Sequence, residues 1–253
     1  MSVRRDALGE SIPEEFVNVV VKKSTVMFTT LELATLHNVA DIIRGNIAIL
    51  YRVSEAVALL DMLVSFAHHC TLHECAVPEF SDAINIVDGR HPILEDLGSE
   101  VVPNSTSTTA ATFTIVSGPN MGGKSTYLRQ IVYLVIMAQI GSLVPAKSAT
   151  LKVFSKLFVR MNNNDSTPTS ESSFLCEMHD IAYILQSYDR HSLVVIDELG
   201  RSTAAAEGKA ICRAVCEELV DSAATVFLTT HFLDLPEILG QHGNCTRVVL
   251  SAM

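Results

Sequence analysis

The sequence lacks the features of a membrane protein or a secreted protein. It contains no apolar run that approaches the roughly 18 uncharged residues of a spanning helix, and residues 1–10 (MSVRRDALGE) lack the apolar centre of a signal peptide. The 6 cysteines have no regular spacing in a chain of 253 residues, which indicates reduced thiols and not a disulfide framework. We therefore expect a soluble intracellular protein that does not bind membranes.

Basic residues are also scarce. The sequence has 18 Lys and Arg against 28 Asp and Glu, a net charge of −10, which disfavours broad electrostatic adhesion to nucleic acid or anionic lipid. The pairs Arg4–Arg5 and Lys22–Lys23 are too short to form a nucleic-acid patch. Any contact with DNA would need other regions of a larger protein, or a partner.

The composition nevertheless supports a substantial core, because 48% of the residues are hydrophobic and 18% are charged. The length allows one large domain, or one domain and part of a second. From residue 113 onward, strand-like and helical segments alternate, which favours a mostly parallel sheet covered by helices. The first 90 or so residues are largely helical and lack this alternation. We expect a helical arm joined to an α/β nucleotide-binding core.

The local patterns predict the following elements. Residues 16–27 form a strand interrupted at 22–24, and 29–69 are helical with a break at Gly45–Asn46. Residues 99–112 form a connector and 162–173 a polar loop. Strands are expected at 84–87, 113–116, 193–196 and 225–229, and helices at 125–140, 177–187 and 208–220.

One segment carries a phosphate-binding pattern. Residues 118–125 (GPNMGGKS) fit G-x-x-x-x-G-K-[S/T] between a predicted strand and a predicted helix. The backbone N–H groups of such a loop and the helix behind it attract phosphate. Lys124 would reach the β- and γ-phosphates, and the Ser125 hydroxyl would ligate Mg²⁺. The expected nucleotide-binding residues are Gly118, Pro119, Asn120, Met121, Gly122, Gly123, Lys124, Ser125 and Thr126.

Two carboxylates follow a predicted buried strand, Leu193–Ile196. Carboxylates at the C-terminal end of such a strand lie where open α/β sheets bind ligands. Asp197 is expected to hold Mg²⁺, and Glu198 to orient or deprotonate the attacking water. A second apolar run leads to His231, which could face the γ-phosphate or its water. A lone histidine is more often a surface residue or a hydrogen-bonded core residue.

Several metal-binding side chains lie near one another in the sequence: His68, His69, Cys70, His73 and Cys75. A closed structural zinc site usually needs two paired clusters, and no second CxxC or HxxxH pair is visible. We therefore predict no metal site from this segment.

Four segments together resemble the ATPase core of the MutS family: SGPNMGGKSTYLRQI, SSFLCEM, VVIDELGRST and TTHF. Upstream, LYRVSEAVALLDMLVSFAHHCT and DGRHPILE are similar to the stretch that leads from the family's lever helices into the ATPase. The family's proteins are ABC-type ATPases of mismatch repair and meiotic recombination. The residues around IAYILQS and GKAICRAVCEEL resemble those of the meiosis-specific branch of the family, which forms the MutSγ heterodimer.

The resemblance implies an ABC-type P-loop NTPase core with a mostly parallel sheet (residues 81–253, apparently truncated at its C-terminus), preceded by a lever-type arm (1–80). It implies ATP and Mg²⁺ as ligands, a nuclear location, and a second MutS homologue that completes each nucleotide site. Asn120 and His231 match family residues near the γ-phosphate. Ser172 matches the serine that reaches the partner's ATP; it could also be a helix N-cap, and the two roles are compatible. DNA would be bound through regions mostly absent from this chain.

The sequence departs from the family pattern in four places. The aromatic residue beside adenine falls at Val101 or Val102, and residues 201–206 (RSTAAA) lose side chains of the dimer contact. The arm between Leu36 and Tyr51 is about 20 residues short, judged from the family resemblance and from helix rise. The helix-turn-helix that normally locks the family's dimers would follow Met253. Two hypotheses remain: an ATPase that controls a dimeric clamp on mismatched or branched DNA, or a non-hydrolysing ATP-binding interaction module. A transport-type or chromosome-type ABC ATPase is disfavoured because no LSGGQ-like signature occurs.

Overall fold

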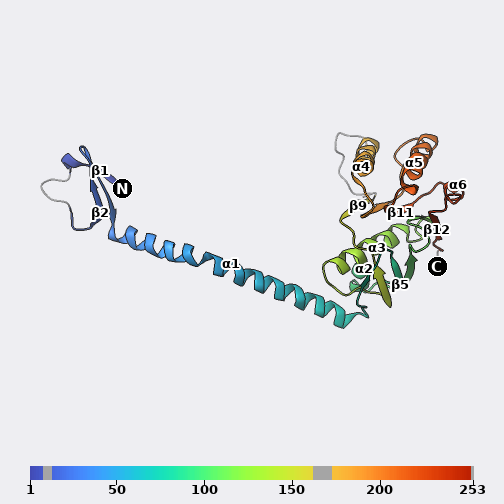
Figure 1. Ribbon diagram of the computed structural model, residues 1–253, viewed down its shortest axis with the longest axis horizontal. Helices are drawn as coiled ribbons and strands as arrows, with labels where there is room; N and C mark the ends of the chain where they lie inside the picture. Colours follow the sequence, from blue (N-terminus) through green and yellow to red (C-terminus); the bar gives the residue numbers. More distant parts are fainter. Residues whose placement is uncertain (8–12, 162–172, 252–253) are drawn as a thin grey trace. The chain divides into compact units, whose positions relative to one another are not determined.

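The computed structural model describes residues 1–7, 13–161 and 173–251 (Figure 1). The chain divides into two compact units, Met1–Ser65 and Phe66–Met253, and each is described by itself. Within the described ranges, no helix combines the length and the apolar character that crossing a membrane requires. The domain boundary after residue 80 remains a prediction.

The first unit begins with a small antiparallel sheet. Its strands β1 (Ser2–Arg4), β2 (Phe16–Val21) and β3 (Thr25–Thr30) pair in the order β1-β3-β2, and a 3-10 helix (Arg5–Ala7) follows β1. The Lys22 N–H donates to the Thr25 carbonyl at 2.8 Å, which closes the turn between β2 and β3. The interruption predicted at residues 22–24 is confirmed.

Helix α1 (Leu31–Leu72) is one continuous helix of 42 residues. The break predicted at Gly45–Asn46 is therefore wrong. A single glycine inside a helix costs about 1 kcal/mol relative to alanine, too little to end a helix when good helix formers lie on both sides. The Asn46 side chain donates to the Ile42 carbonyl at 2.8 Å, so its amide is satisfied within the helix.

The second unit contains a five-stranded sheet whose neighbours all pair in parallel, in the order β12-β7-β11-β10-β9. Every residue of the three middle strands is buried, as their continuous apolar runs predict. The strands are β7 (Phe113–Ser117), β9 (Lys156–Arg160), β10 (Ser192–Ile196), β11 (Thr225–Thr229) and β12 (Cys245–Val249). The expected mixed α/β fold with a parallel sheet is confirmed.

Helices cover both faces of this sheet (Figure 1). Because side chains alternate along a strand, Leu193 and Val195 join the core on the α3 side, and Val194 and Ile196 join the core on the opposite side. The first face is covered by α3 (Lys124–Gln139), and the second by α4 (Ser173–Ser187), α5 (Ala205–Val220) and α6 (Leu235–Leu239).

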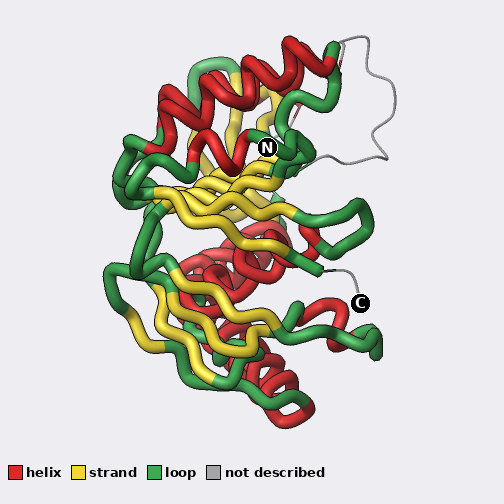
Figure 2. Tube along the Cα trace, turned by 90° about the vertical axis from the view of Figure 1, so that its right-hand side faces the viewer, coloured by secondary structure: helices red, strands yellow, loops and turns green. Residues whose placement is uncertain are grey.

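A second sheet packs on the other side of α3, which lies between the two sheets (Figure 2). Its order is β4-β8-β5-β6, formed by β4 (Glu79–Phe80), β5 (Asn85–Gly89), β6 (Asn104–Ser107) and β8 (Ser148–Leu151). The short helix α2 (Pro92–Asp96) follows β5. Strand β6 lies inside the predicted connector, so that prediction is wrong in part. A polar edge strand is held by backbone pairing, and buried Thr106 shares a hydrogen bond of 2.8 Å with the Tyr127 hydroxyl.

Candidate functional site

The Gly118–Ser125 loop joins the end of β7 to the start of α3. Met121 and Gly123 have positive φ values of 62° and 82°, which turn the chain sharply before the helix. At Gly118 a Cβ would lie 2.6 Å from the Leu250 carbonyl oxygen, so only glycine permits this approach. The strand–loop–helix context that the sequence pattern requires is present, and the N-terminus of α3 lies behind the loop.

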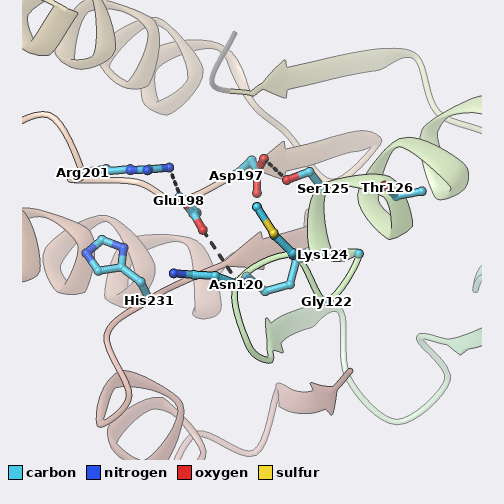
Figure 3. Close-up of a pocket in the computed structure, with 11 residues that line it drawn as sticks. Asn120, Gly122, Lys124, Ser125, Thr126, Asp197, Glu198, Arg201 and His231 are labelled. Carbon is cyan, nitrogen blue, oxygen red and sulfur yellow. Dashed lines mark hydrogen bonds and ion pairs between the residues drawn. The ribbon is translucent and has the colours of Figure 1, made fainter. Parts of the chain in front are cut away.

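A cavity of about 660 Å³ opens in front of this loop (Figure 3). Most of the predicted site residues line it, although their segments are far apart in the sequence. Its lining consists of Asn120, Met121, Gly122, Gly123, Lys124, Ser125, Thr126, Asp197, Glu198, Arg201 and His231. Gly118 and Pro119 contribute through their carbonyl oxygens, each of which accepts a hydrogen bond of 3.1 Å from Lys124 Nζ. Ser172 lies outside the described residues.

Asp197 is buried and receives two short hydrogen bonds from hydroxyl groups. Ser125 Oγ donates to Oδ2 at 2.6 Å, and Thr229 Oγ1 donates to Oδ1 at 2.5 Å. Strand β11 lies between β7 and β10, so its end brings Thr229 beside the loop and the acidic pair. The Asp197 carboxylate and the Ser125 hydroxyl thus present oxygen atoms at one edge of the cavity.

Glu198 has an unusual backbone conformation for a residue other than glycine, with φ at 51°. Its N–H donates to Thr229 Oγ1 at 2.9 Å, and its Oε2 accepts from Arg201 Nη1 at 2.9 Å. Its Oε1 lies 3.9 Å from the buried Lys124 Nζ. A left-handed conformation at such a residue costs on the order of 1 kcal/mol or more and is concentrated at functional sites. The carboxylate is held between two cations at the mouth of the cavity.

His231 follows β11 and lines the same cavity with an exposed side chain. Its ring lies 4.0 Å, centroid to centroid, from the ring of Phe232, which is buried in the core. The structure therefore places this imidazole on the side of the cavity opposite Ser125 (Figure 3).

A second cavity of about 560 Å³ adjoins the first, because Met121, Gly122, Gly123 and Thr126 line both. Val101 and Val102 line it, at the position where the family resemblance places an aromatic residue. Gln130 is also in its wall, and its buried Nε2 has no hydrogen-bond partner among the described residues.

His91 gives the second cavity a neutral imidazole. Burial lowers the pKa of His91, and nearby Arg129 adds to this effect. Its Nδ1 accepts a hydrogen bond of 3.3 Å from the Leu94 N–H, which requires that nitrogen to be unprotonated. The imidazole thus adds no charge to the wall of the second cavity.

The chain after the acidic pair is fixed by two glycines in contact. A Cβ on Gly208 would lie 2.1 Å from the Gly200 carbonyl oxygen, and Gly200 has a φ of 83°. The Gly200 N–H donates to buried Glu177 Oε1 at 3.1 Å, which ties this turn to α4. These contacts set the direction in which the chain leaves the site.

Two residues of this arrangement were not predicted from the sequence: Thr229, which bonds to both acidic residues, and Arg201, which pairs with Glu198. The signal for Thr229 was available, because parallel strands end at one edge of a sheet and a hydroxyl there can reach a neighbouring strand. Arg201 is 62% exposed and gives no comparable signal in the sequence.

Comparison with known proteins shows the family to which this chain is similar. The family profile described as MutS domain V matches residues 114–253. The human "MutS protein homolog 4" is 40% identical over 251 residues, which cover 91% of this chain and 27% of that protein. The Caenorhabditis elegans "MutS protein homolog him-14" is 38% identical over 254 residues, 92% of this chain and 30% of that protein.

A bacterial protein matches as well: the "DNA mismatch repair protein MutS" of Thermotoga neapolitana is 39% identical over 210 residues, covering 82% of this chain and 26% of that protein. The chain thus spans between about a quarter and a third of the length of these relatives. The matched profile covers more than half of the chain and contains both the Gly118–Ser125 loop and the acidic pair. The chain belongs to the MutS family.

Proposed function

We propose that this chain is the ATP-binding and ATP-hydrolysing core of a MutS-type DNA repair or recombination protein, with an ABC-type P-loop NTPase fold. The observation that carries the proposal is the junction of the Gly118–Ser125 loop with the acidic pair. Ser125 bonds to Asp197 at 2.6 Å, and Lys124 lies 3.9 Å from Glu198, around one cavity. A phosphate loop, an oxygen pair for a cation and a carboxylate base are the parts that phosphoryl transfer to water requires.

The two adjoining cavities fit a nucleotide that spans the loop. The triphosphate belongs in the first, where the loop N–H groups and Lys124 supply positive charge. On phosphate binding, Lys124 Nζ exchanges its two carbonyl acceptors for phosphate oxygens. The base belongs in the second, where Val101 and Val102 offer apolar contact and Gln130 offers an unused amide donor. Without an aromatic residue at this position, we expect the base to be held by apolar packing and not by stacking.

Ser125 Oγ and the Asp197 carboxylate fit Mg²⁺, because both are hard oxygen ligands at one edge of the cavity. When bound, the ion would neutralise charge on the phosphate oxygens. The hydrogen bond from Thr229 would hold the Asp197 carboxylate in place when Ser125 turns toward the ion.

Glu198 is the proposed acceptor of the proton from the attacking water. Its carboxylate has to release Arg201 before Oε2 can take that proton, since the ion pair at 2.9 Å occupies this oxygen. Arg201, 62% exposed, is free to move toward phosphate charge as it leaves Glu198. His231 and Asn120 line the same cavity and would orient the terminal phosphate or its water.

Family membership extends this proposal to a partner subunit, to DNA and to a cellular location. We infer that a second MutS homologue faces the nucleotide, with Ser172 reaching the partner's site, and that ATP closes a clamp on mismatched or branched DNA in the nucleus. The similarity to "MutS protein homolog 4" proteins favours meiotic junctions over mismatches. The chain's net charge of −10 is consistent with DNA contacts supplied by other regions.

A second candidate is a non-hydrolysing module that binds ATP as a structural ligand of a heterodimer. Two observations favour it. The Arg201–Glu198 ion pair occupies the proposed base, and Ala204 and Ala205 lack the side chains that serve the dimer contact in the family pattern. Nucleotide binding without turnover, even with a MutS-homologue partner present, would support this candidate.

The test compares two substitutions within one cavity. Lys124→Ala removes the phosphate contact and should abolish ATP binding and turnover together. Glu198→Ala should retain ATP binding and lose turnover, because only the proposed base is removed. Turnover in Glu198→Ala at the wild-type rate would refute the assigned role, and unaltered ATP binding by Lys124→Ala would refute the nucleotide site.

A further inference from the structure

A second cluster of polar side chains lies in the Phe66–Met253 unit, away from the ATP cavity. His69 is in the last turn of α1, and His73 follows the helix with its N–H bonded to the His69 carbonyl at 3.2 Å. The two imidazoles therefore share a face, with ring centroids 4.8 Å apart. Asp96, at the end of α2, faces both of them. One nitrogen from each histidine and one Asp96 oxygen all lie within 4.8 Å of one another.

The distances in this cluster are close to those of a tetrahedral metal site. His69 Nδ1 lies 3.4 Å from Asp96 Oδ1, and ligands at 2.0–2.2 Å around a tetrahedral ion are about 3.3–3.6 Å apart. His73 Nε2 is hydrogen-bonded to the same oxygen at 2.6 Å. That bond would open by roughly 0.7 Å to admit the ion. The three ligand atoms lie within 4.8 Å of one another, so the two imidazoles would also have to approach each other, by up to about 1.5 Å, to reach tetrahedral spacing. The two backbone segments already hold the three groups together.

The surroundings of His73 support ligation. Its second ring nitrogen, Nδ1, lies 3.6 Å from Glu95 Oε1, and Arg90 Nε holds that carboxylate at 2.8 Å. A carboxylate behind a histidine fixes the ring and makes its other nitrogen a better ligand.

We propose that His69, His73 and Asp96 bind a zinc ion that fastens the end of α1 to α2. Two imidazole nitrogens and one carboxylate are a ligand set that suits Zn²⁺, whereas Mg²⁺ requires mainly oxygen ligands. Asp96 is 51% exposed, so a water has access to the fourth position. No metal site was predicted from this segment, because the sequence shows no second CxxC or HxxxH pair. The third ligand, Asp96, comes from a separate short helix that only folding brings to the histidines.

The experiment titrates ZnCl₂ into the tag-free chain by calorimetry, with Mg²⁺ present throughout. The wild type should bind one equivalent of zinc, and zinc should raise its melting temperature. His73→Gln and Asp96→Asn should each weaken binding at least tenfold. The matched control is His68→Gln, which changes an exposed neighbour on the same helix and should bind like the wild type.

Circular dichroism verifies that each variant is folded, and cobalt substitution identifies the ligands. The proposal requires a cobalt spectrum without a thiolate charge-transfer band. Such a band would assign the ion to cysteine and overturn the proposed ligand set. The proposal also fails if the folded wild type takes up no zinc, or if His73→Gln and Asp96→Asn bind as tightly as His68→Gln does.

Discussion

Thr229 is hydrogen-bonded to both residues of the acidic pair, Asp197 and Glu198. Its hydroxyl donates to Asp197 at 2.5 Å and accepts the Glu198 N–H at 2.9 Å, and its side chain is fully buried. Thr229→Val keeps the shape and the strand preference but removes both hydrogen bonds. Asp197 then loses one donor, and the Glu198 N–H loses its acceptor.

The expected loss in the free energy of unfolding of Thr229→Val follows from these two hydrogen bonds. A hydrogen bond to a charged group contributes about 1.5–3 kcal/mol, and an unpartnered buried N–H costs about 1–3 kcal/mol. Because the site can relax in part, we expect a loss of about 3 kcal/mol in the free energy of unfolding. For a chain of this size that corresponds to a fall in melting temperature of roughly 6–12 °C.

Thr114→Val is the matched control. Thr114 is 1% exposed and lies on β7 of the same sheet, but its hydroxyl has no hydrogen-bond partner among the described residues. Removing an unpartnered buried hydroxyl should be neutral or stabilising. The assay is thermal unfolding of both variants followed by circular dichroism. Equal melting temperatures for Thr229→Val and Thr114→Val would refute the role given to the Thr229 hydroxyl.

Three further predictions concern other parts of the chain. Gly208→Ala should lower stability by about 2 kcal/mol in urea titrations, since its Cβ would meet the Gly200 carbonyl oxygen at 2.1 Å; wild-type stability would contradict this contact. Gly45→Ala, with nothing within 4 Å, should raise the helix stability of α1 by about 1 kcal/mol, and a loss would contradict a continuous helix there. Burial raises the pKa of the Cys75 thiol to about 12, and a hydrogen bond between the Cys216 thiol and Cys212, together with burial, raises the pKa of Cys216. Both thiols should therefore be alkylated slowly by iodoacetamide at mildly alkaline pH until the chain unfolds. Rapid alkylation of either thiol in the folded chain, detected by mass spectrometry, would contradict these environments.

The parallel sheet was predictable because its middle strands are buried on both sides and therefore have continuous apolar runs, such as Leu193–Ile196. The Gly118–Ser125 loop was predictable because phosphate binding demands particular residues at fixed spacing. Strand β6 was not, since its polar residues resemble a connector and only pairing with β5 makes them a strand. The continuity of α1 at Gly45 was missed because one glycine is a weak helix breaker.

The residues of the site fall into the same two groups: those that a short sequence pattern shows and those that only the fold brings together. Asn120–Ser125 and Asp197–Glu198 are local patterns that a sequence displays directly. The hydrogen bonds of Thr229 and the ion pair of Arg201 depend on which strand lies between which, and the order β7-β11-β10 is not encoded in any short segment. The assembly of His69, His73 and Asp96 depends in the same way on α2 folding back toward the end of α1.

The most direct test of the nucleotide site is calorimetric titration of Mg²⁺-ATP into the wild-type chain and into Lys124→Ala. One nucleotide should bind per wild-type chain and none to the folded variant, because Lys124 holds the phosphates within the cavity. Equal binding by both proteins, or no binding by the wild type, would contradict the claim that the Gly118–Ser125 loop and the acidic pair form a nucleotide site.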